Sequence, residues 1–322
     1  MRSLWKDMLV AVWLGVIIPG IVLNGIALKE RRAEKEPKPL SLTEKTLAQR
    51  PILVRDPEGT VTEMDLDAYL SGVLLAEIPG EFHTEALKAQ SVAARTYTWK
   101  AFTTGGKHGD HSVCTDSACC QAYIPEEVYL SRGGTVENLE KVSGAVSATS
   151  GFVLYHDGVL IEATYFSSAG GHTEAAADVW GADFPYLQAV SSPEEIRSHE
   201  VIYTAGEFEN LLGVNLSGDC ENWFGAVSYT EGGGVGTMEI GGTIYSGTQL
   251  RSALRLKSTD FQMHPEGERI RITTQGYGHR VGMSQYGANA MAEAGSTWQQ
   301  ILQHYYPGTN LAPLEEIRRN PG

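Results

Sequence analysis

The stretch DLDAYLSGVLLAEIPGEFHTEALKAQSVAARTYTWKA, residues 65–101, organises the chain. Its first part, from Asp65 to Glu77, reads as a helix, and Thr62 together with Asp65 resembles a capping box at its start. Pro79 ends this helix, because the residue before a proline is pushed out of the helical region. A second helix is expected from about residue 84 to residue 101. Glu77 is therefore expected on the last turn of the first helix.

The position of Glu77 predicts a carboxyl group with a raised pKa. The unpaired carbonyls at a helix C-terminus carry partial negative charge, and the apolar neighbours Leu74, Leu75 and Ile78 would desolvate the carboxylate. A carboxylic acid that stays protonated near neutral pH suits a general acid. The local pattern fits equally a solvated carboxylate at an ordinary helix end.

The second helix combines small residues with two cations. Several alanines give it a surface that another element can approach closely, while Lys88 and Arg95, seven residues apart, are expected to point the same way. Gln90 lies about 200° around the helix from Lys88. The alternative for the two cations is ordinary surface charge.

The charge and the length of the chain restrict its class. The net charge is −14, from 25 Lys and Arg against 39 Asp and Glu, and the acidic excess is larger beyond residue 38. This balance argues against duplex nucleic acid as a partner, because no basic surface is available to release its counterions. The 322 residues are enough for about two domains with cores of their own.

The N-terminal region predicts a membrane anchor. Residues 8–28 (MLVAVWLGVIIPGIVLNGIAL) form an uncharged apolar run that is long enough to cross a bilayer, and no small-x-small cleavage pattern follows them. Residues 1–7 are then a cytoplasmic tail, and the charged, proline-bearing residues 29–49 are a linker. Five Lys or Arg follow the span and two precede it, so the positive-inside rule alone favours a cytoplasmic body.

The remaining chain predicts an α+β fold with two domains behind this single transmembrane helix. Helical patterns cover residues 136–148, 205–213 and 247–256, and Asp157-Gly158 in the middle of an apolar run signals a β-hairpin. We expect the domain that carries Glu77 to comprise residues 50–195 and a return segment, 269–322. A smaller domain, 196–268, is expected between them.

The four cysteines do not resemble a disulfide framework. Cys114, Cys119 and Cys120 occur within seven residues, beside His108 and His111, whereas Cys220 lies a hundred residues further on. This crowding favours a metal site. The alternative is free or oxidised cysteines without a metal.

Five motifs in order resemble one family. They are AEIPGEFHTEALKAQSVAARTY, the Cys/His loop, YFSSAGGHTE with VWGADFPYL, GTQLRSALRLKSTDF and GYGHRVGMSQYGA, together spread over residues 50–312 behind a single span. This set resembles stage II sporulation protein D, a family of peptidoglycan lytic transglycosylases that act during engulfment of the forespore. One glycine of the family's G-H-G-V-G-M pattern is Arg280 in this chain, which leaves open whether a tight turn forms there.

The resemblance implies roles for particular residues. It implies that Glu77 is the catalytic acid and that zinc is held by His108, Cys114 and Cys120. Cys119 is our expected fourth ligand, with His111 as its competitor, and a four-ligand zinc is structural. Residues at or near the glycan are implied to be Lys88, Gln90, Arg95, Tyr165, Ser167, Ser168, Gly170, Gly171, Thr173 and His279.

The resemblance also implies a substrate, partners and a location. The substrate is glycan stripped of stem peptides by an amidase partner, stage II sporulation protein P, and stage II sporulation protein M is the membrane partner. Such glycan exposes a lactyl carboxylate, with which Lys88 or Arg95 could pair. Because peptidoglycan lies outside the cell membrane, the body of this single-pass protein is expected to be extracytoplasmic, facing the forespore from the mother-cell membrane.

Three other readings stay open. A muramidase that uses water would pair Glu77 with Glu174 or Asp178. A non-catalytic activator of amidases would bind peptidoglycan without cutting it. A zinc amidase would work through His108 and Cys114.

Overall fold

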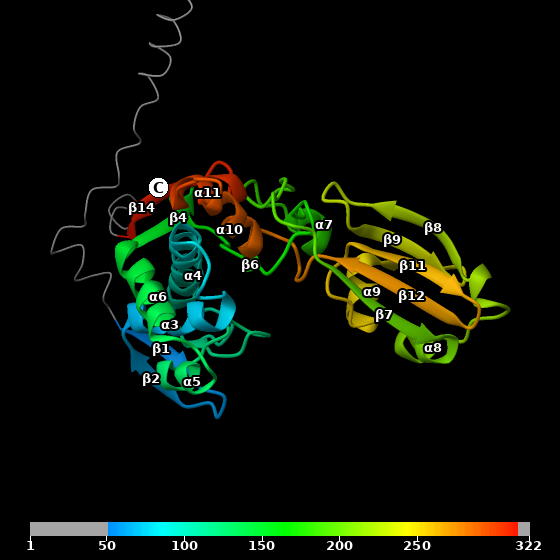
Figure 1. The fold of residues 1–322 in the computed structure, drawn as a ribbon, viewed down its shortest axis with the longest axis horizontal. Coiled ribbons are helices and arrows are strands. Elements are labelled where there is room, and N and C mark those ends of the chain that lie inside the picture. The colour runs from blue at the N-terminus through cyan, green and yellow to red at the C-terminus, as the bar shows by residue number, and fades with distance from the viewer. Residues whose placement is uncertain (1–50, 315–322) are drawn as a thin grey trace, which may run out of the picture. The chain divides into compact units, whose positions relative to one another are not determined.

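The computed structural model describes residues 51–314, which form a mixed α+β fold (Figure 1). The mixed class agrees with the sequence-based prediction. The predicted tail, membrane anchor and linker, residues 1–49, lie outside the described residues. Within residues 51–314, every helix is too short or too polar to span a bilayer.

The first helix begins beside a small sheet. Strand β1 (Ile52–Arg55) pairs antiparallel with β2 (Val61–Met64) and parallel with β3 (Val113–Cys114). Helix α3 (Leu66–Glu77) follows, and its N-cap Asp65 accepts a hydrogen bond from the backbone N–H of Ala68 at 2.9 Å. The predicted capping box was wrong, because Thr62 lies in β2. The helix ends at Glu77 as predicted, since Ile78 is extended before the proline.

Helix α4 (Thr84–Thr104) lies at the centre of this part of the protein. Four of its five alanines are buried, and it contacts α3, α6 (Val136–Ala148), α10 (Gln285–Glu293), α11 (Trp298–Tyr305) and β4 (Phe152–His156). Small side chains allow this close approach from several sides at once. The helix extends three residues beyond the predicted end and stops at Gly105, which is left-handed with φ +89°.

Short strands complete this part. The hairpin predicted at Asp157-Gly158 is confirmed: β4 pairs antiparallel with β5 (Val159–Leu160), and on its other edge with β14 (Asn310–Pro313). Strand β6 (Tyr165–Phe166) pairs parallel with β13 (Met283–Ser284), so two predicted motifs far apart in sequence lie side by side. Two short helices are α5 (Glu126–Ser131) and α7 (Ala176–Trp180).

The segment after residue 196 forms two three-stranded sheets. One has the order β10-β9-β8, from β8 (Phe224–Tyr229), β9 (Val235–Ile240) and β10 (Thr243–Ser246). The other has the order β11-β12-β7, from β7 (Ser198–Thr204), β11 (Phe261–Glu266) and β12 (Arg269–Gln275). Helices α8 (Ala205–Leu212) and α9 (Gly247–Ala253) and the short helix η1 (Cys220–Asn222) pack with them.

Strand β12 pairs with strands of a different part of the protein from the one to which the sequence assigned it. The sequence assigned it to the return segment after residue 268, but it pairs along its whole length with β7 and β11. Its side chains Ile270 and Ile272 are fully buried in the same apolar cluster as Phe208 and Leu250. This strand therefore belongs to the sheet of the smaller segment.

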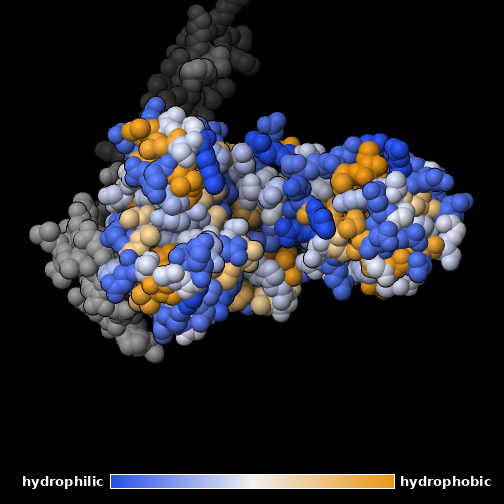
Figure 2. Space-filling view, turned by 90° about the horizontal axis from the view of Figure 1, so that it is seen from below, coloured by the Kyte–Doolittle hydropathy of each residue, from blue (hydrophilic) through white to orange (hydrophobic). Residues whose placement is uncertain are grey.

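Apolar side chains are gathered inside the protein. Two buried clusters surround α4, one shared with α3 and the other with α10 and α11, and a third fills the smaller segment. Figure 2 shows the consequence on one face, where hydrophilic residues cover most of the surface and apolar residues form separate patches. Burial of these clusters is the main source of folding free energy.

Candidate functional site

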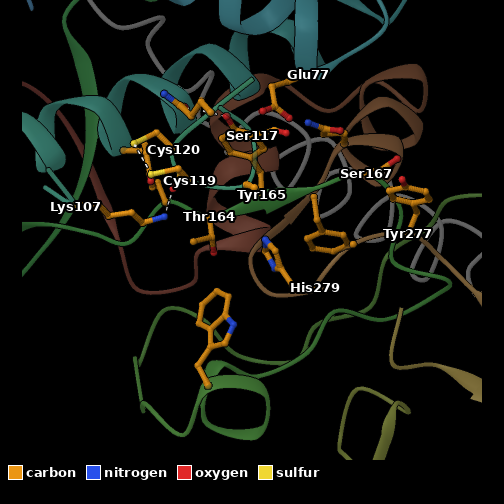
Figure 3. A pocket seen from close by; sticks show the side chains of 18 residues that line it. Glu77, Lys107, Ser117, Cys119, Cys120, Thr164, Tyr165, Ser167, Tyr277 and His279 are labelled. Atoms are coloured by element: carbon orange, nitrogen blue, oxygen red, sulfur yellow. Dashed lines mark hydrogen bonds between the residues drawn. The ribbon is translucent and has the colours of Figure 1, made fainter. Parts of the chain in front are cut away.

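A pocket of about 540 Å³ opens beside the end of α3 (Figure 3). Its walls come from segments far apart in the chain: Glu77, residues 117–121 of the cysteine loop, residues 163–167 around β6, and residues 277–279. Its volume lies in the usual range for small-molecule sites. The pocket therefore gathers four of the motifs that the sequence singled out.

Glu77 lies at one edge of this pocket, half-buried. Its Oε1 accepts a hydrogen bond from the backbone N–H of Ala122 at 2.7 Å. Desolvation raises the pKa of Glu77 above its usual value, and the bond from Ala122 opposes this only in part. The last turn of α3 also carries no basic residue to offset the helix dipole. Glu77 thus combines access to the pocket with a pKa raised in the predicted direction.

Tyr165 lies close to Glu77 in Figure 3 and is fixed by a hydrogen-bond chain. Its hydroxyl donates to Oε1 of Gln121 at 2.9 Å, and Nε2 of Gln121 donates to the hydroxyl of Thr98 at 2.9 Å. Desolvation, with a smaller contribution from the charge of Glu77, raises the pKa of Tyr165 well above its usual value. Tyr165 is therefore a neutral hydroxyl with a fixed direction. The sequence reasoning did not single out Gln121, although it directly follows Cys120.

His279 lines the opposite side of the pocket between two aromatic rings. The centroid of its ring is 5.6 Å from that of Phe166 and 5.3 Å from that of Trp180. Its Nδ1 accepts a hydrogen bond from the backbone N–H of Val281 at 3.1 Å. Desolvation, together with the positive charge of Arg251, lowers the pKa of His279 to about 4. The imidazole is therefore neutral near pH 7.

Exposed aromatic side chains border the same pocket. Trp180 is 43% exposed and Tyr277 is 45% exposed, although large aromatic side chains are usually buried. Flat apolar rings of this kind suit contact with the faces of sugar rings. Trp180 belongs to the VWGADFPYL motif and Tyr277 to the GYGHRVGMSQYGA motif.

Only part of the loop of residues 167–173 lines the pocket. Ser167 borders the pocket. Ser168 is buried and exchanges both backbone hydrogen bonds with Tyr277, at 3.1 and 2.7 Å. Gly170 has φ +72°, and a Cβ there would lie 3.2 Å from the backbone of residues 275–276. Ser168 and Gly170, predicted to contact the substrate, contact other parts of the protein in this loop.

The next two residues likewise contact protein. Thr173 is fully buried, and its hydroxyl accepts a hydrogen bond from the N–H of Val190 at 2.8 Å. The carbonyl of Gly171 accepts one from the N–H of Ser192 at 2.8 Å. Neither residue lines the pocket. They hold the loop that presents Ser167.

Arg280 adopts a tight-turn backbone conformation, although the family pattern has glycine at this position. Its φ is +64°, so a non-glycine residue adopts the left-handed conformation there. The side chain is buried, and it donates to Oε1 of Glu174 at 3.0 Å and to the carbonyl of Gly232, in the β8–β9 turn, at 2.8 Å. Further bonds to the carbonyls of Ala169 and His172 compensate for its burial.

Lys88 and Arg95, predicted as substrate ligands, do not line the pocket. Nζ of Lys88 pairs with Oε1 of Glu85 at 2.7 Å. Arg95 is fully buried and donates to the carbonyls of Val146 and Thr149 at the end of α6, at 3.0 and 2.8 Å. Carbonyls at a helix C-terminus carry partial negative charge and favour a cation. The seven-residue spacing of Lys88 and Arg95 did not predict their surroundings, because α4 packs against other elements on several sides.

Gln90 also lies in the interior. It is fully buried on α4, and neither side-chain polar atom has a hydrogen-bond partner among the described residues. It does not line the pocket.

The cysteine loop brings four potential ligands together, namely His108, Cys114, Cys119 and Cys120. Their ligand atoms all lie within 4.8 Å of one another, so this group could hold a metal ion. Nε2 of His108 is 3.8 Å from Sγ of Cys119 and 3.7 Å from Sγ of Cys120. The predicted competitor, His111, instead has its Nδ1 2.6 Å from the carbonyl of Phe102.

The spacing of this cluster fits a tetrahedral metal. With metal–sulfur bonds of about 2.3 Å, two ligand sulfurs lie roughly 3.8 Å apart, and the sulfurs of Cys119 and Cys120 are 4.0 Å apart. A disulfide would need about 2.05 Å, and all four cysteines are free. Cys119 and Cys120 also line the pocket. The Cys₃His cluster and Glu77 therefore both contribute to the wall of this pocket.

The fold and the site together define an α+β protein whose pocket carries one carboxyl group beside a Cys₃His cluster. A family model described as stage II sporulation protein matches residues 55–156. Stage II sporulation protein D of Bacillus amyloliquefaciens is 34% identical over 317 residues, covering 94% of this chain and 92% of that protein. The protein of the same name from Bacillus subtilis is 35% identical, covering 90% and 88%. The chain belongs to the stage II sporulation protein D family.

A relative with another name is more distant. The amidase enhancer of Bacillus subtilis is 31% identical over 300 residues, which cover 75% of this chain but 40% of that protein. The similarity therefore extends beyond proteins named for sporulation.

Proposed function

We propose that the protein is a lytic transglycosylase that cleaves peptidoglycan glycan strands, freed of stem peptides, between N-acetylmuramic acid and N-acetylglucosamine. The observation that carries this proposal is that Glu77 is the single carboxyl group among the described residues that line the pocket. A lytic transglycosylase uses one carboxyl group twice, as acid and then as base. A water-using glycosidase usually needs a second carboxylate across the cleft.

The carboxylates of the rival reaction lie elsewhere. Glu174 is fully buried and paired with Arg280, and Asp178 on α7 does not line the pocket. Neither is available to activate water opposite Glu77. The zinc amidase is disfavoured in a similar way, because His108 and Cys114 belong to a cluster with four protein ligands, which leaves no open position on a tetrahedral metal.

The proposed reaction needs one proton that leaves Glu77 and returns. Protonated Glu77 donates to the glycosidic oxygen, and the bond from that oxygen to C1 of the muramoyl residue breaks. The muramoyl C6 hydroxyl bonds to C1, and Glu77 takes up the hydroxyl proton as the 1,6-anhydro ring closes. No water is consumed. Ala122 holds Oε1 of Glu77, which leaves Oε2 free for the proton transfer.

We propose that the cluster metal is zinc and that its role is structural. Three thiolates and one imidazole are typical of closed zinc sites, which stabilise the fold around them. The loop that holds these ligands continues into Gln121 and Ala122, which contact Tyr165 and Glu77. The metal would therefore hold the pocket wall in place without entering the reaction.

Membership of the family is the basis for proposing where the protein acts and with which partners. We propose that the protein acts in engulfment at the cell membrane, anchored by residues 8–28, with its body outside. Stage II sporulation protein P would strip the stem peptides, and stage II sporulation protein M would be the membrane partner. These partners are family-level proposals.

The test compares the wild type with Glu77→Gln on peptide-free glycan strands. Loss of the general acid should lower the rate of strand cleavage roughly 100- to 10,000-fold. Glu81→Gln is the matched control, because Glu81 is an exposed carboxylate four residues further on that contacts Asn138. Mass spectrometry of the wild-type products should show 1,6-anhydromuramic ends. Reducing muramic acid ends would instead identify a hydrolase.

A second candidate, a non-catalytic activator of amidases, is favoured by the similarity to an amidase enhancer. It predicts that purified protein binds glycan and releases no fragments. It also predicts that Glu77→Gln stimulates a peptidoglycan amidase as fully as the wild type does.

A further inference from the structure

Lys107 contributes a positive charge to the wall of the pocket. It is the one Lys or Arg among the described residues that line the pocket, as Glu77 is the one carboxyl group. His279 adds no positive charge near neutral pH, because its pKa is lowered to about 4. A negatively charged group on a bound molecule therefore has one cationic side chain to pair with in this pocket.

The Lys107 side chain makes a polar contact with the cysteine loop. The residue lies between Gly105, which ends α4, and His108 of the metal-binding cluster. Its Nζ donates to the backbone carbonyl of Cys119, and Figure 3 shows the nitrogen directed toward that residue. An ammonium group has three donors, so this contact leaves others for a ligand.

Lys107 borders a second pocket as well. A second, smaller pocket of about 230 Å³ shares Tyr97, Lys107 and Cys120 with the first and adds Lys100. Nζ of Lys100 is paired with Oε1 of Glu162 at 2.7 Å, so its charge is already balanced. Lys107 therefore borders two pockets, and Glu77 lines the larger of them.

We propose that Lys107 binds the free lactyl carboxylate of a muramic acid residue and so selects strands without stem peptides. This inference rests on the proposed function. In a peptide-bearing strand the lactyl carboxyl is a neutral amide, which cannot form a charge-assisted hydrogen bond with an ammonium group. The net charge of −14 makes a local cation necessary for an anionic polymer. Lys88 and Arg95, expected in this role, contact protein groups outside the pocket.

The experiment measures binding without turnover. The Glu77→Gln protein is titrated with two probes: peptide-free glycan strands, and the same strands with their lactyl carboxyls converted to methylamides. Adding Lys107→Gln should weaken binding of the free-acid strands about fivefold to tenfold and leave binding of the methylamide strands unchanged. Adding Lys107→Arg should retain most of the affinity.

The matched control is Lys141→Gln. Nζ of Lys141 also contacts a backbone carbonyl, that of Glu81, at 3.1 Å, but it lies outside the pocket. This change should leave both affinities as they are. Bound metal is measured in each variant, because Lys107 lies next to the cysteine cluster.

The possible results separate the two proposals. Equal weakening of both strands by Lys107→Gln, or no weakening of either, overturns the carboxylate subsite. Loss of bound metal together with equal weakening would assign Lys107 to the cluster alone. If the wild type forms no anhydro ends, the proposed function fails, whatever the Lys107 variants bind. If anhydro ends form and the two strand types bind equally well, only the subsite fails.

Discussion

At the scale of single residues, the site depends on how the protein solvates Glu77. The carboxyl group retains one backbone donor, the N–H of Ala122, and loses much of its contact with water. Both the end of α3 and the apolar surroundings favour the protonated form. The same arrangement should make the carboxylate a cost to the folded state at pH values at which it is ionised.

This cost predicts a pH-dependent effect of Glu77→Gln on stability. Because the folded-state pKa is raised above the ordinary value of 4.5, the folded protein binds this proton more tightly than the unfolded chain does. Stability contributed by Glu77 is therefore present below about pH 4.5 and is lost as the pH rises through the folded pKa. The amide keeps an acceptor for Ala122 and stays neutral, so Glu77→Gln should raise Tm at pH 8.

The comparison at low pH is the control for that prediction. At pH 4 the wild-type carboxyl is already protonated, so the two proteins should have nearly equal Tm values in differential scanning calorimetry. A gain of the same size at both pH values would show that the carboxylate is not destabilised.

His279 predicts a second titration behaviour. Its pKa is lowered to about 4, chiefly by desolvation, and its Nδ1 accepts a backbone hydrogen bond. NMR of the imidazole nitrogens should therefore find a neutral ring, protonated on Nε2, at pH 6. A titration midpoint near 6.5, the ordinary value for histidine, would contradict this expectation.

Arg280 predicts a large loss of stability when it is removed. Arg280→Ala leaves Glu174 buried without its cation and removes donors from three backbone carbonyls. We expect a decrease in the free energy of unfolding of about 3 to 5 kcal/mol, measured by urea denaturation. Arg280→Gly should cost about 1 kcal/mol less, because glycine adopts the positive φ without strain. A loss below 1 kcal/mol for Arg280→Ala would contradict the assigned role.

At the scale of elements, the cysteine loop connects the Cys₃His cluster to Glu77. Cys120 is followed directly by Gln121, which holds Tyr165, and by Ala122, which holds Glu77. Residues 115–120 of this loop are exposed or half-buried. Its shape near Glu77 should therefore depend on the cluster that closes it.

This dependence predicts what happens when the metal is lost. Cys119→Ala should lower metal affinity more than tenfold and increase the hydrogen-exchange rate of the Ala122 amide. His111→Ala should retain the metal, because His111 contacts the carbonyl of Phe102 and not the cluster. Cys220→Ala controls for general effects of cysteine loss, since Cys220 lies outside the cluster.

Two measurements would contradict the prediction. One is unchanged metal content in Cys119→Ala together with loss of metal in His111→Ala. The other is an unchanged exchange rate at Ala122 after chelation.

At the scale of the whole molecule, the smaller segment has a core of its own. Its apolar cluster is built from residues between 201 and 272, so it is complete once β12 is included. The β8–β9 turn of this segment also reaches Arg280 and Glu174, next to the wall of the pocket. The segment therefore combines independent packing with a polar contact to the site region.

The apolar cluster of this segment predicts which fragments fold on their own. A fragment of residues 196–276 should unfold cooperatively on heating, because all members of its cluster are present. A fragment of residues 196–268 should not, because it lacks Ile270, Ile272 and the strand between β7 and β11. Circular dichroism as a function of temperature measures both. Cooperative unfolding of the shorter fragment would contradict the role of β12.

The amino-acid sequence by itself determined the local features of this protein. The end of α3 at Glu77 follows from the proline after Ile78, the hairpin from Asp157-Gly158, and the cysteine cluster from ligands that are close in sequence. Each depends on residues within about one loop or one helix of one another, and such interactions can be read from spacing and backbone preference.

Only the tertiary structure decided which side chains face the pocket. Arg95 and Lys107 are both cations at or just beyond α4, yet Arg95 is buried against the end of α6 and Lys107 borders the pocket. Strand β12 likewise took its place from partners between 65 and 77 residues away, from the pair Arg269 and Thr204 to the pair Gln275 and Ser198. The physical reason is that burial and hydrogen-bond partners are set by segments distant in sequence, whose approach no local pattern specifies.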